Sequence, residues 1–146
     1  MGAKKKAVRR RGPVEFSESD FEVRDSSIPK IGKGLFAIRL IRPGDTIGFY
    51  LGKIINDKMA EEEPYISSRY LVYVCADHWI EGRIDGNYTR FINHSNKPNA
   101  ELVTSVRWKS ARIKALKLIR PGDEIFFDYG EDYWEALESE LSPVEK

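Results

Sequence analysis

Arg90-Phe91-Ile92-Asn93-His94-Ser95-Asn96-Lys97-Pro98-Asn99 is the most informative segment of this chain. After two apolar residues near its start the segment is polar, and Pro98 together with the Asn and Ser residues favours turns and local side-chain hydrogen bonds. The segment nevertheless lies between two strand-like runs, so the chain passes through it on the way into a core. Because buried polar groups need hydrogen-bond partners, a polar segment held against a core predicts a functional site.

A second segment, Gly122-Asp123-Glu124-Ile125-Phe126-Phe127-Asp128-Tyr129-Gly130, ends in an aromatic run that its pattern alone would assign to a core strand. It begins inside an internal echo, because Leu40-Ile41-Arg42-Pro43-Gly44-Asp45-Thr46-Ile47 recurs as Leu118-Ile119-Arg120-Pro121-Gly122-Asp123-Glu124-Ile125. Pro-Gly is the signal of a type II turn, in which the glycine takes a positive φ. Two copies are too few for a stacked repeat, so we interpret the echo as one turn used twice.

Size and composition indicate one compact domain. The chain has 146 residues, of which 41% are hydrophobic and 12% aromatic, enough for a single modest core. Residues 1–13 are predicted to be a basic flexible tail with six Lys or Arg residues, whereas the rest of the chain carries 18 basic against 23 acidic side chains. An acidic body favours basic partners. The tail lacks the apolar region of a secretory signal, and no apolar run approaches the roughly 20 residues of a membrane span.

Short β-rich runs separated by turn signals predict a mostly β fold. The run Tyr70–Cys75 is the strongest of them, because it is rich in aromatic and β-branched residues. We expect a surface loop over residues 57–64 and a helix over residues 132–140. The expected strands lie within residues 21–24, 31–37, 70–75, 79–80, 100–106, 111–118 and 125–128.

Together the polar segment and the aromatic segment resemble the paired signature of SET-domain protein-lysine methyltransferases. The resemblance covers roughly residues 20–134 through four segments in the family's order. It implies a SET-domain fold of several small sheets with a pseudoknot and a short C-terminal helix. Residues 14–134 would form the domain, and residues 135–146 a helical tail. The four segments are Gly32-Lys33-Gly34-Leu35-Phe36, Tyr50-Leu51-Gly52, Arg90–Asn99 and Phe126–Gly130.

The chain lacks the cysteine clusters with which many SET enzymes bind zinc, and in this it is similar to viral and stand-alone microbial SET proteins. Cys75 is its single cysteine, so we expect no metal site and a reducing compartment. In zinc-bearing relatives a segment after the domain covers the cofactor. The resemblance assigns this role here to Tyr133 and Trp134, with a helix packing face as the alternative for both.

The resemblance also implies a function: methyl transfer from S-adenosyl-L-methionine to the ε-amine of a lysine in a histone or histone-like basic tail. A phenylalanine at Phe127 rather than a tyrosine implies di- or trimethyl-lysine as the product. The expected location is intracellular, in the nucleus and on chromatin in a eukaryote or virus and in the cytoplasm of a bacterium. The alternative is a catalytically idle SET module that binds basic peptides, or DNA through the basic tail. The resemblance also allows a homodimer, and no sequence feature selects between a monomer and a dimer.

The resemblance assigns roles to particular residues. Tyr129 is expected to be the catalytic tyrosine, Phe127 to set the number of methyl groups, and Tyr70 to border the lysine channel, with Tyr73 as the competing choice. An aromatic channel suits this chemistry because desolvation lowers the pKa of a lysine amine, and only the neutral amine is a nucleophile. The residues expected to bind the cofactor are Lys33, Gly34, Leu35, Tyr50, Arg90, Phe91, Asn93, His94, Tyr129, Tyr133 and Trp134.

Overall fold

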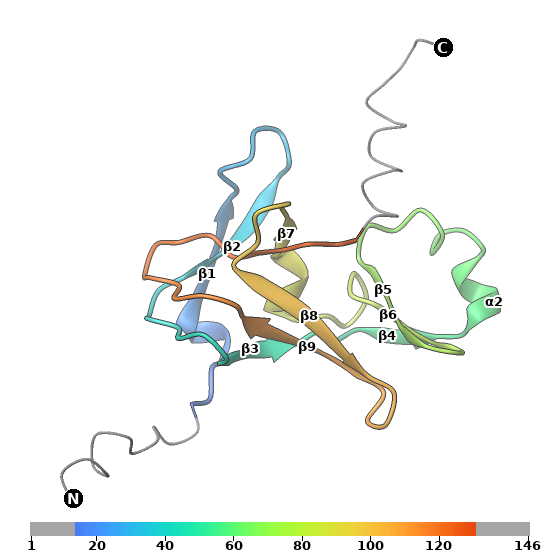
Figure 1. Ribbon diagram of the computed structural model, residues 1–146. Coiled ribbons are helices and arrows are strands. Elements are labelled where there is room, and N and C mark those ends of the chain that lie inside the picture. The colour runs from blue at the N-terminus through green and yellow to red at the C-terminus, as the bar shows by residue number, and fades with distance from the viewer. Residues whose placement is uncertain (1–13, 131–146) are drawn as a thin grey trace, which may run out of the picture.

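The computed structural model describes residues 14–130, which form mainly short strands (Figure 1). Two 3-10 helices, Glu18–Asp20 and Tyr88–Phe91, and a short α-helix, α2 (Asp57–Ala60), complete the regular structure of these residues. The predicted mostly β fold is confirmed. The strands are β1 (Phe21–Asp25), β2 (Lys33–Ala37), β3 (Thr46–Phe49), β4 (Lys53–Ile55), β5 (Leu71–Cys75), β6 (His78–Glu81), β7 (Asn93–His94), β8 (Ala100–Ser105), β9 (Ser110–Ala115) and β10 (Phe126–Phe127).

The strands of the described residues form four small sheets. β1 pairs with β2, β9 lies between β3 and β8, and β6 lies between β4 and β5, all of them antiparallel. β7 and β10 form a two-stranded parallel pair. Figure 1 shows the β3–β9–β8 sheet between the β1–β2 ribbon and the β4–β6–β5 sheet. The core therefore lies where three separate sheets meet.

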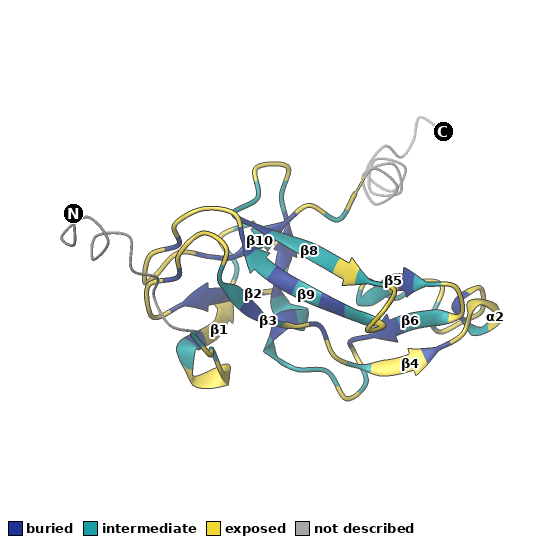
Figure 2. Ribbon diagram, turned by 60° about the horizontal axis from the view of Figure 1, so that its bottom comes forward, coloured by how far each residue is buried: buried dark blue, intermediate teal, exposed yellow. Residues whose placement is uncertain are grey.

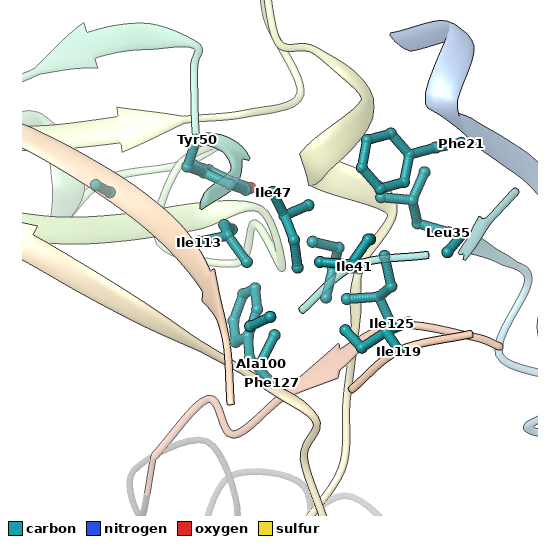
Figure 3. Packing of buried hydrophobic residues seen from close by; sticks show 14 of the residues in the cluster. Phe21, Leu35, Ile41, Ile47, Tyr50, Ala100, Ile113, Ile119, Ile125 and Phe127 are labelled. Carbon is teal, nitrogen blue, oxygen red and sulfur yellow. The ribbon is translucent and has the colours of Figure 1, made fainter. Parts of the chain in front are cut away.

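Mostly aliphatic side chains fill this core, together with the aromatic Phe21, Tyr50 and Phe127 (Figure 3). Along β9 the residues alternate between buried and half-buried, as the two-residue period of a strand requires, and Ala111, Ile113 and Ala115 point inward. β2 is buried along nearly its whole length, whereas Figure 2 shows exposed residues in β4 and the connecting loops. The core side chains with 0% exposure include Leu35, Ile41, Ile47, Ile113, Ile119 and Ile125.

The two copies of the sequence echo form the same turn and pair with each other. Gly44 and Gly122 both take a positive φ, of 91° and 95°. In each copy the aspartate side chain accepts a hydrogen bond from the backbone N–H of the arginine that opens the turn. Ile41 and Ile119 exchange two backbone hydrogen bonds of 2.9 Å each. The interpretation of one turn used twice is therefore confirmed, and the pairing of its copies is an addition that the sequence did not predict.

The two signature segments lie side by side in the parallel pair of β7 and β10. Asn93 is level with Phe126, and His94 is level with Phe127. Asn99 joins the segments with its side chain, whose nitrogen donates to the backbone carbonyl of Glu124 and whose oxygen accepts from the backbone N–H of Phe126, both at 2.9 Å. The polar residues of this segment thus satisfy backbone groups inside the fold, as expected for buried polar side chains.

One expected element is wrong, and others lie outside the described residues. Residues 57–64, expected as a surface loop, contain α2, because the Asn56 side chain accepts a hydrogen bond of 2.8 Å from the Met59 N–H and caps the helix. The basic tail, the helix expected over 132–140 and the tail 135–146 lie outside the described part. No helix among residues 14–130 is long and apolar enough to cross a membrane.

Replacement of Asn99 tests the link between the signature segments. Asn99→Ala is expected to lower the free energy of unfolding by about 1–3 kcal/mol, because it removes two hydrogen bonds and leaves two partly buried backbone groups without them. Asn96, an exposed asparagine in the same segment, is the matched control. Asn96→Ala should change the free energy by about 0.5 kcal/mol or less. Urea unfolding measures both, and equal effects would contradict the assigned role of Asn99.

Candidate active site

A cavity of about 130 Å³ opens beside Asn93, between the loop that precedes β2 and the segment that leads into β7. We call it the Asn93 cavity. It combines three cationic side chains with apolar and aromatic surface, so it suits a ligand that carries both an anionic group and flat apolar parts. Its lining consists of Ile31, Gly32, Lys33, Arg69, Tyr70, Arg90, Phe91, Asn93 and Tyr129.

Asn93 and Glu124 hold the walls of the Asn93 cavity together. The Asn93 side chain donates to the Lys33 carbonyl at 2.8 Å and to the Glu124 carboxylate at 3.4 Å. The same carboxylate, in a residue only 8% exposed, accepts bonds of 2.7 Å from two serine hydroxyls of the β1–β2 connection. A Cβ atom at Gly34 would overlap it, so this close approach requires glycine. The loop at the cavity is therefore anchored before any ligand binds.

A second cavity of about 310 Å³ lies between β5 and β8, which are the edge strands of their sheets. We call it the Tyr73 cavity. Most of its lining is apolar or aromatic, and Tyr73 in this lining is 52% exposed. The lining residues are Tyr50, Ser68, Arg69, Leu71, Val72, Tyr73, Leu102, Phe127, Asp128 and Tyr129.

Among residues 14–130, Tyr129 and Arg69 alone line both cavities. The Tyr129 hydroxyl donates to the Ile92 carbonyl at 2.8 Å, and its backbone N–H donates to Nδ1 of His94 at 2.6 Å. Its ring also packs on that of Phe127, with the ring centres 4.9 Å apart. These contacts hold the phenol in the wall that separates the two cavities.

His94 lines neither cavity but supports Tyr129 from behind. The two rings meet edge to face, with their centres 5.0 Å apart. Nδ1 of His94 accepts a hydrogen bond, so the imidazole is neutral in this arrangement. Burial lowers the pKa of His94 below its ordinary value of 6.5, and the Asp128 carboxylate, 3.8 Å from Nδ1, opposes this shift.

A hydrogen bond links Tyr50, in the lining of the Tyr73 cavity, to Tyr70, in the lining of the Asn93 cavity. Tyr50 is 4% exposed, and its hydroxyl donates to the Tyr70 carbonyl at 2.7 Å. Burial, followed by the nearby Tyr129 and Glu81 side chains, raises the pKa of the Tyr50 phenol, so it remains a proton donor. Tyr70 lines the Asn93 cavity, whereas its competitor Tyr73 lines the other one.

The family model of the SET domain matches residues 32–130, which contain both signature segments and the wall between the cavities. The chain belongs to the SET domain family. Over 106 residues it is 37% identical to the histone-lysine N-methyltransferase set-2 of Caenorhabditis elegans, which covers 67% of this chain and 7% of that protein. Over 128 residues it is 34% identical to the histone-lysine N-methyltransferase set1 of Dictyostelium discoideum, with 82% and 8% covered. The chain thus spans less than a tenth of either relative.

Solved structures share the fold of this SET domain. A humanised mutant of the Chaetomium thermophilum Polycomb Repressive Complex 2, bound to the inhibitor GSK343, superimposes with a TM-score of 0.69 at 27% identity. The match covers 75% of this chain and 15% of the matched chain. The crystal structure of the Chaetomium thermophilum complex gives a TM-score of 0.70 at 26% identity, with 77% and 15% covered. The SET-domain fold expected from the two signature segments is therefore confirmed.

The structure sorts the residues that were expected to bind a cofactor into three groups. Gly34, Leu35, Tyr50 and His94 lie outside the lining of the Asn93 cavity, where they form or support its framework. Tyr133 and Trp134 lie outside the described residues. Those that do line the cavity are Lys33, Arg90, Phe91, Asn93 and Tyr129.

Sequence reasoning missed Ile31 and Arg69, which line the Asn93 cavity from the two neighbouring loops. Each stands directly beside a residue singled out by its motif, Gly32 and Tyr70 respectively. That adjacency was the available signal. No three His, Cys, Asp or Glu side chains in the described part of this SET domain are placed to hold a metal ion.

The lowered pKa of His94 predicts how stability depends on pH. Below pH 6.5 the unfolded chain takes up a proton at this position, whereas the folded domain resists it because the neutral form is the one that fits. The free energy of unfolding should therefore fall as the pH drops below about 6.5, and stay unaffected by this group above that value. Carboxylates titrate at lower pH and leave the first part of this window clear.

Two variants separate His94 from the other histidine of the chain, His78. His94→Gln should make the free energy of unfolding less dependent on pH between pH 7 and about pH 5, at some cost in stability. His78→Gln should keep the pH dependence of the wild-type chain. Urea unfolding at a series of pH values measures this difference. The assignment fails when the slope survives in His94→Gln.

Proposed function

We propose that this SET domain transfers methyl groups from S-adenosyl-L-methionine to the ε-amine of a lysine in a protein. The observation that carries the proposal is the meeting of two cavities at the Tyr129 phenol. One cavity would hold the methyl donor and the other would admit the lysine, so the reacting atoms approach one wall from opposite sides. The names of the relatives, histone-lysine N-methyltransferases, support the same reaction.

The Asn93 cavity fits the methyl donor chemically. Arg90, together with Lys33 beside its ion-pair partner Asp25, offers positive charge to its carboxylate, while Ile31 and Phe91 offer apolar surface to its uncharged parts. The anchoring of the loop by Asn93 reduces the ordering that binding would otherwise require. When bound, the donor supplies an electrophilic methyl group on a positively charged sulfur.

Tyr129 would act by positioning. Its hydroxyl hydrogen points to the Ile92 carbonyl, so its oxygen serves as an acceptor toward the groups that enter. Such an oxygen holds an amine N–H in direct contact and a methyl C–H in a weaker one, and alignment of reacting atoms removes a large part of the barrier. The neutral amine is the nucleophile, and both the apolar walls and the nearby Arg69 cation favour it by lowering the pKa of the lysine.

The Tyr73 cavity would receive the lysine of an extended peptide. It lies between the edge strands β5 and β8, and sheet edges are common docking places for an added strand. A histone or histone-like tail on chromatin is the proposed substrate. The acidic balance of the chain beyond its basic tail, and the substrates named for the relatives, support this choice.

Phe127 would permit di- or trimethylation. It lines the Tyr73 cavity next to Tyr129 and is 4% exposed. A tyrosine at this position would add a hydroxyl that holds a water in the channel, and the water would occupy the space that further methyl groups need. The phenylalanine ring leaves that space apolar.

Tyr129→Phe is expected to lower kcat by about 100-fold or more, because the phenol oxygen that positions the amine is lost while the ring remains. Tyr65→Phe removes a hydroxyl that contacts only Lys53 among the described residues and lies outside both cavities, so it should keep wild-type activity. Transfer of labelled methyl groups to histones measures the effect, and calorimetry measures donor binding. Full activity in Tyr129→Phe would remove Tyr129 from its proposed role.

Phe127→Tyr is expected to shift the products of the enzyme toward monomethyl-lysine, since the new hydroxyl holds water where a second methyl group would lie. Phe126→Tyr places the same hydroxyl on the neighbouring residue, which lies on the other face of β10 and outside the Tyr73 cavity, and should leave the product pattern unchanged. Mass spectrometry of the methylated peptide distinguishes the products. An unchanged pattern in Phe127→Tyr with normal folding would rule out this account of product state.

A further inference from the structure

The Tyr73 cavity has one positive and one negative side chain in its lining, Arg69 and Asp128. The other lining residues are neutral. The cavity itself is therefore not an acidic trough for a basic peptide, although the body of the chain is acidic overall. A peptide that lies in this cavity meets charges of both signs, and its residues beside the target lysine must match them.

The backbone around Arg69 is anchored on both sides. Ser68 donates through its hydroxyl to the buried Glu81 carboxylate at 2.9 Å and accepts from the Tyr70 N–H at 3.1 Å. The Tyr70 carbonyl accepts hydrogen bonds from the Tyr50 hydroxyl and from the backbone N–H of Gly82, which follows β6. Arg69 therefore extends from a fixed point at the junction of the two cavities.

The Arg69 guanidinium forms no ion pair with another described residue, although ion pairs do hold Arg24, Arg39 and Arg83. Within residues 14–130, the guanidinium lies over the ring of Tyr70, 5.9 Å from the ring centre. Asp128, by contrast, accepts a backbone hydrogen bond of 2.8 Å and lies near His94. A guanidinium presents a planar pair of donors that matches a carboxylate, so Arg69 is the better placed of the two to select a partner.

Resting on the proposed function, we propose that Arg69 makes the enzyme select lysines that have an Asp or Glu residue beside them in the substrate. The acidic side chain would lie toward Arg69 at the rim of the Tyr73 cavity while the lysine enters next to Tyr129. A lysine or arginine at the same flanking position would be repelled. Within a histone-like protein, target sites of mixed charge would then be preferred over uniformly basic runs.

Arg69 also lines the Asn93 cavity, where an alternative role is to bind the carboxylate of the methyl donor. Arg90 supplies positive charge to that cavity without an ion pair to another described residue, whereas Lys33 pairs with Asp25 at 2.9 Å. The two roles have different consequences. A donor-binding cation affects every peptide by the same factor, whereas a selecting cation changes the ratio between peptides that differ only in the flanking charge.

A peptide library with one lysine and randomised flanking residues tests the proposal. The wild-type chain is incubated with the library and S-adenosyl-L-methionine, and mass spectrometry compares methylated with unmethylated peptides. At one flanking position we expect acidic residues to be enriched about twofold to fivefold over basic ones, which is the upper part of the range for an exposed ion pair. The enrichment should shrink as ionic strength rises.

Charge reversal supplies the decisive comparison. Arg69→Glu should invert the preference at that position so that basic residues are enriched, and Arg69→Gln should abolish it. Arg107→Glu makes the same change on the exposed β8–β9 turn, outside both cavities, and should keep the wild-type preference. Thermal unfolding and calorimetric donor binding confirm that each variant is folded. Arg69→Gln, the milder change, covers the case in which the reversal fails to fold.

The possible outcomes distinguish the role of Arg69 from the proposed function. Methylation of no peptide by the wild-type chain counts against the proposed function itself. Methylation without charge preference, or with a preference that Arg69→Glu leaves in place, overturns the role of Arg69 while the proposed function stands. A uniform loss for all peptides together with weaker donor binding assigns Arg69 to the methyl donor and also overturns the proposal.

Discussion

The parallel pairing of β7 with β10 is the contact on which the rest of the site depends. It sets Asn93 beside Phe126 and His94 beside Phe127, although the two segments are far apart in the sequence. Asn93 then reaches one cavity, and Tyr129, two residues after the end of β10, packs on His94 and lines both. Neither cavity would have its shared wall if the two segments were separate, so folding and formation of the site are one event.

Buried polar groups make this pairing specific. The Glu124 carboxylate accepts bonds from two serine hydroxyls and from Asn93, while its backbone carbonyl accepts one from Asn99. Leaving one such buried group without a partner costs about 1–3 kcal/mol. A shift of the pairing by one residue would break several of these bonds together and turn each side chain to the other face. The contacts that define the register are therefore the contacts that shape the Asn93 cavity.

Local causes made part of this structure predictable from the sequence. Alternation and β-branched residues located β5, β8 and β9 within a few residues, and Pro-Gly located both turns. The pairing of Ile41 with Ile119 was not predictable, because no local property of an isoleucine identifies its partner strand. In the site, the motifs identified Asn93 and Tyr129, whereas Arg69 reaches both cavities only because tertiary hydrogen bonds anchor its loop.

The geometry of the shared wall favours the proposed reaction, and so do the charges around it. Lys33, Arg69 and Arg90 line the Asn93 cavity, and of these the Lys33 ammonium pairs with the Asp25 carboxylate at 2.9 Å. At about 4 Å, two like charges repel by about 1–4 kcal/mol in water or near a protein surface. In the proposed reaction, the cations that line this cavity would disfavour positive charge on a bound sulfur. Loss of the lysine proton would remove one positive charge, and transfer of the methyl group would move the other from the donor's sulfur to the lysine nitrogen, so that charge would pass from the Asn93 cavity toward the Tyr73 cavity.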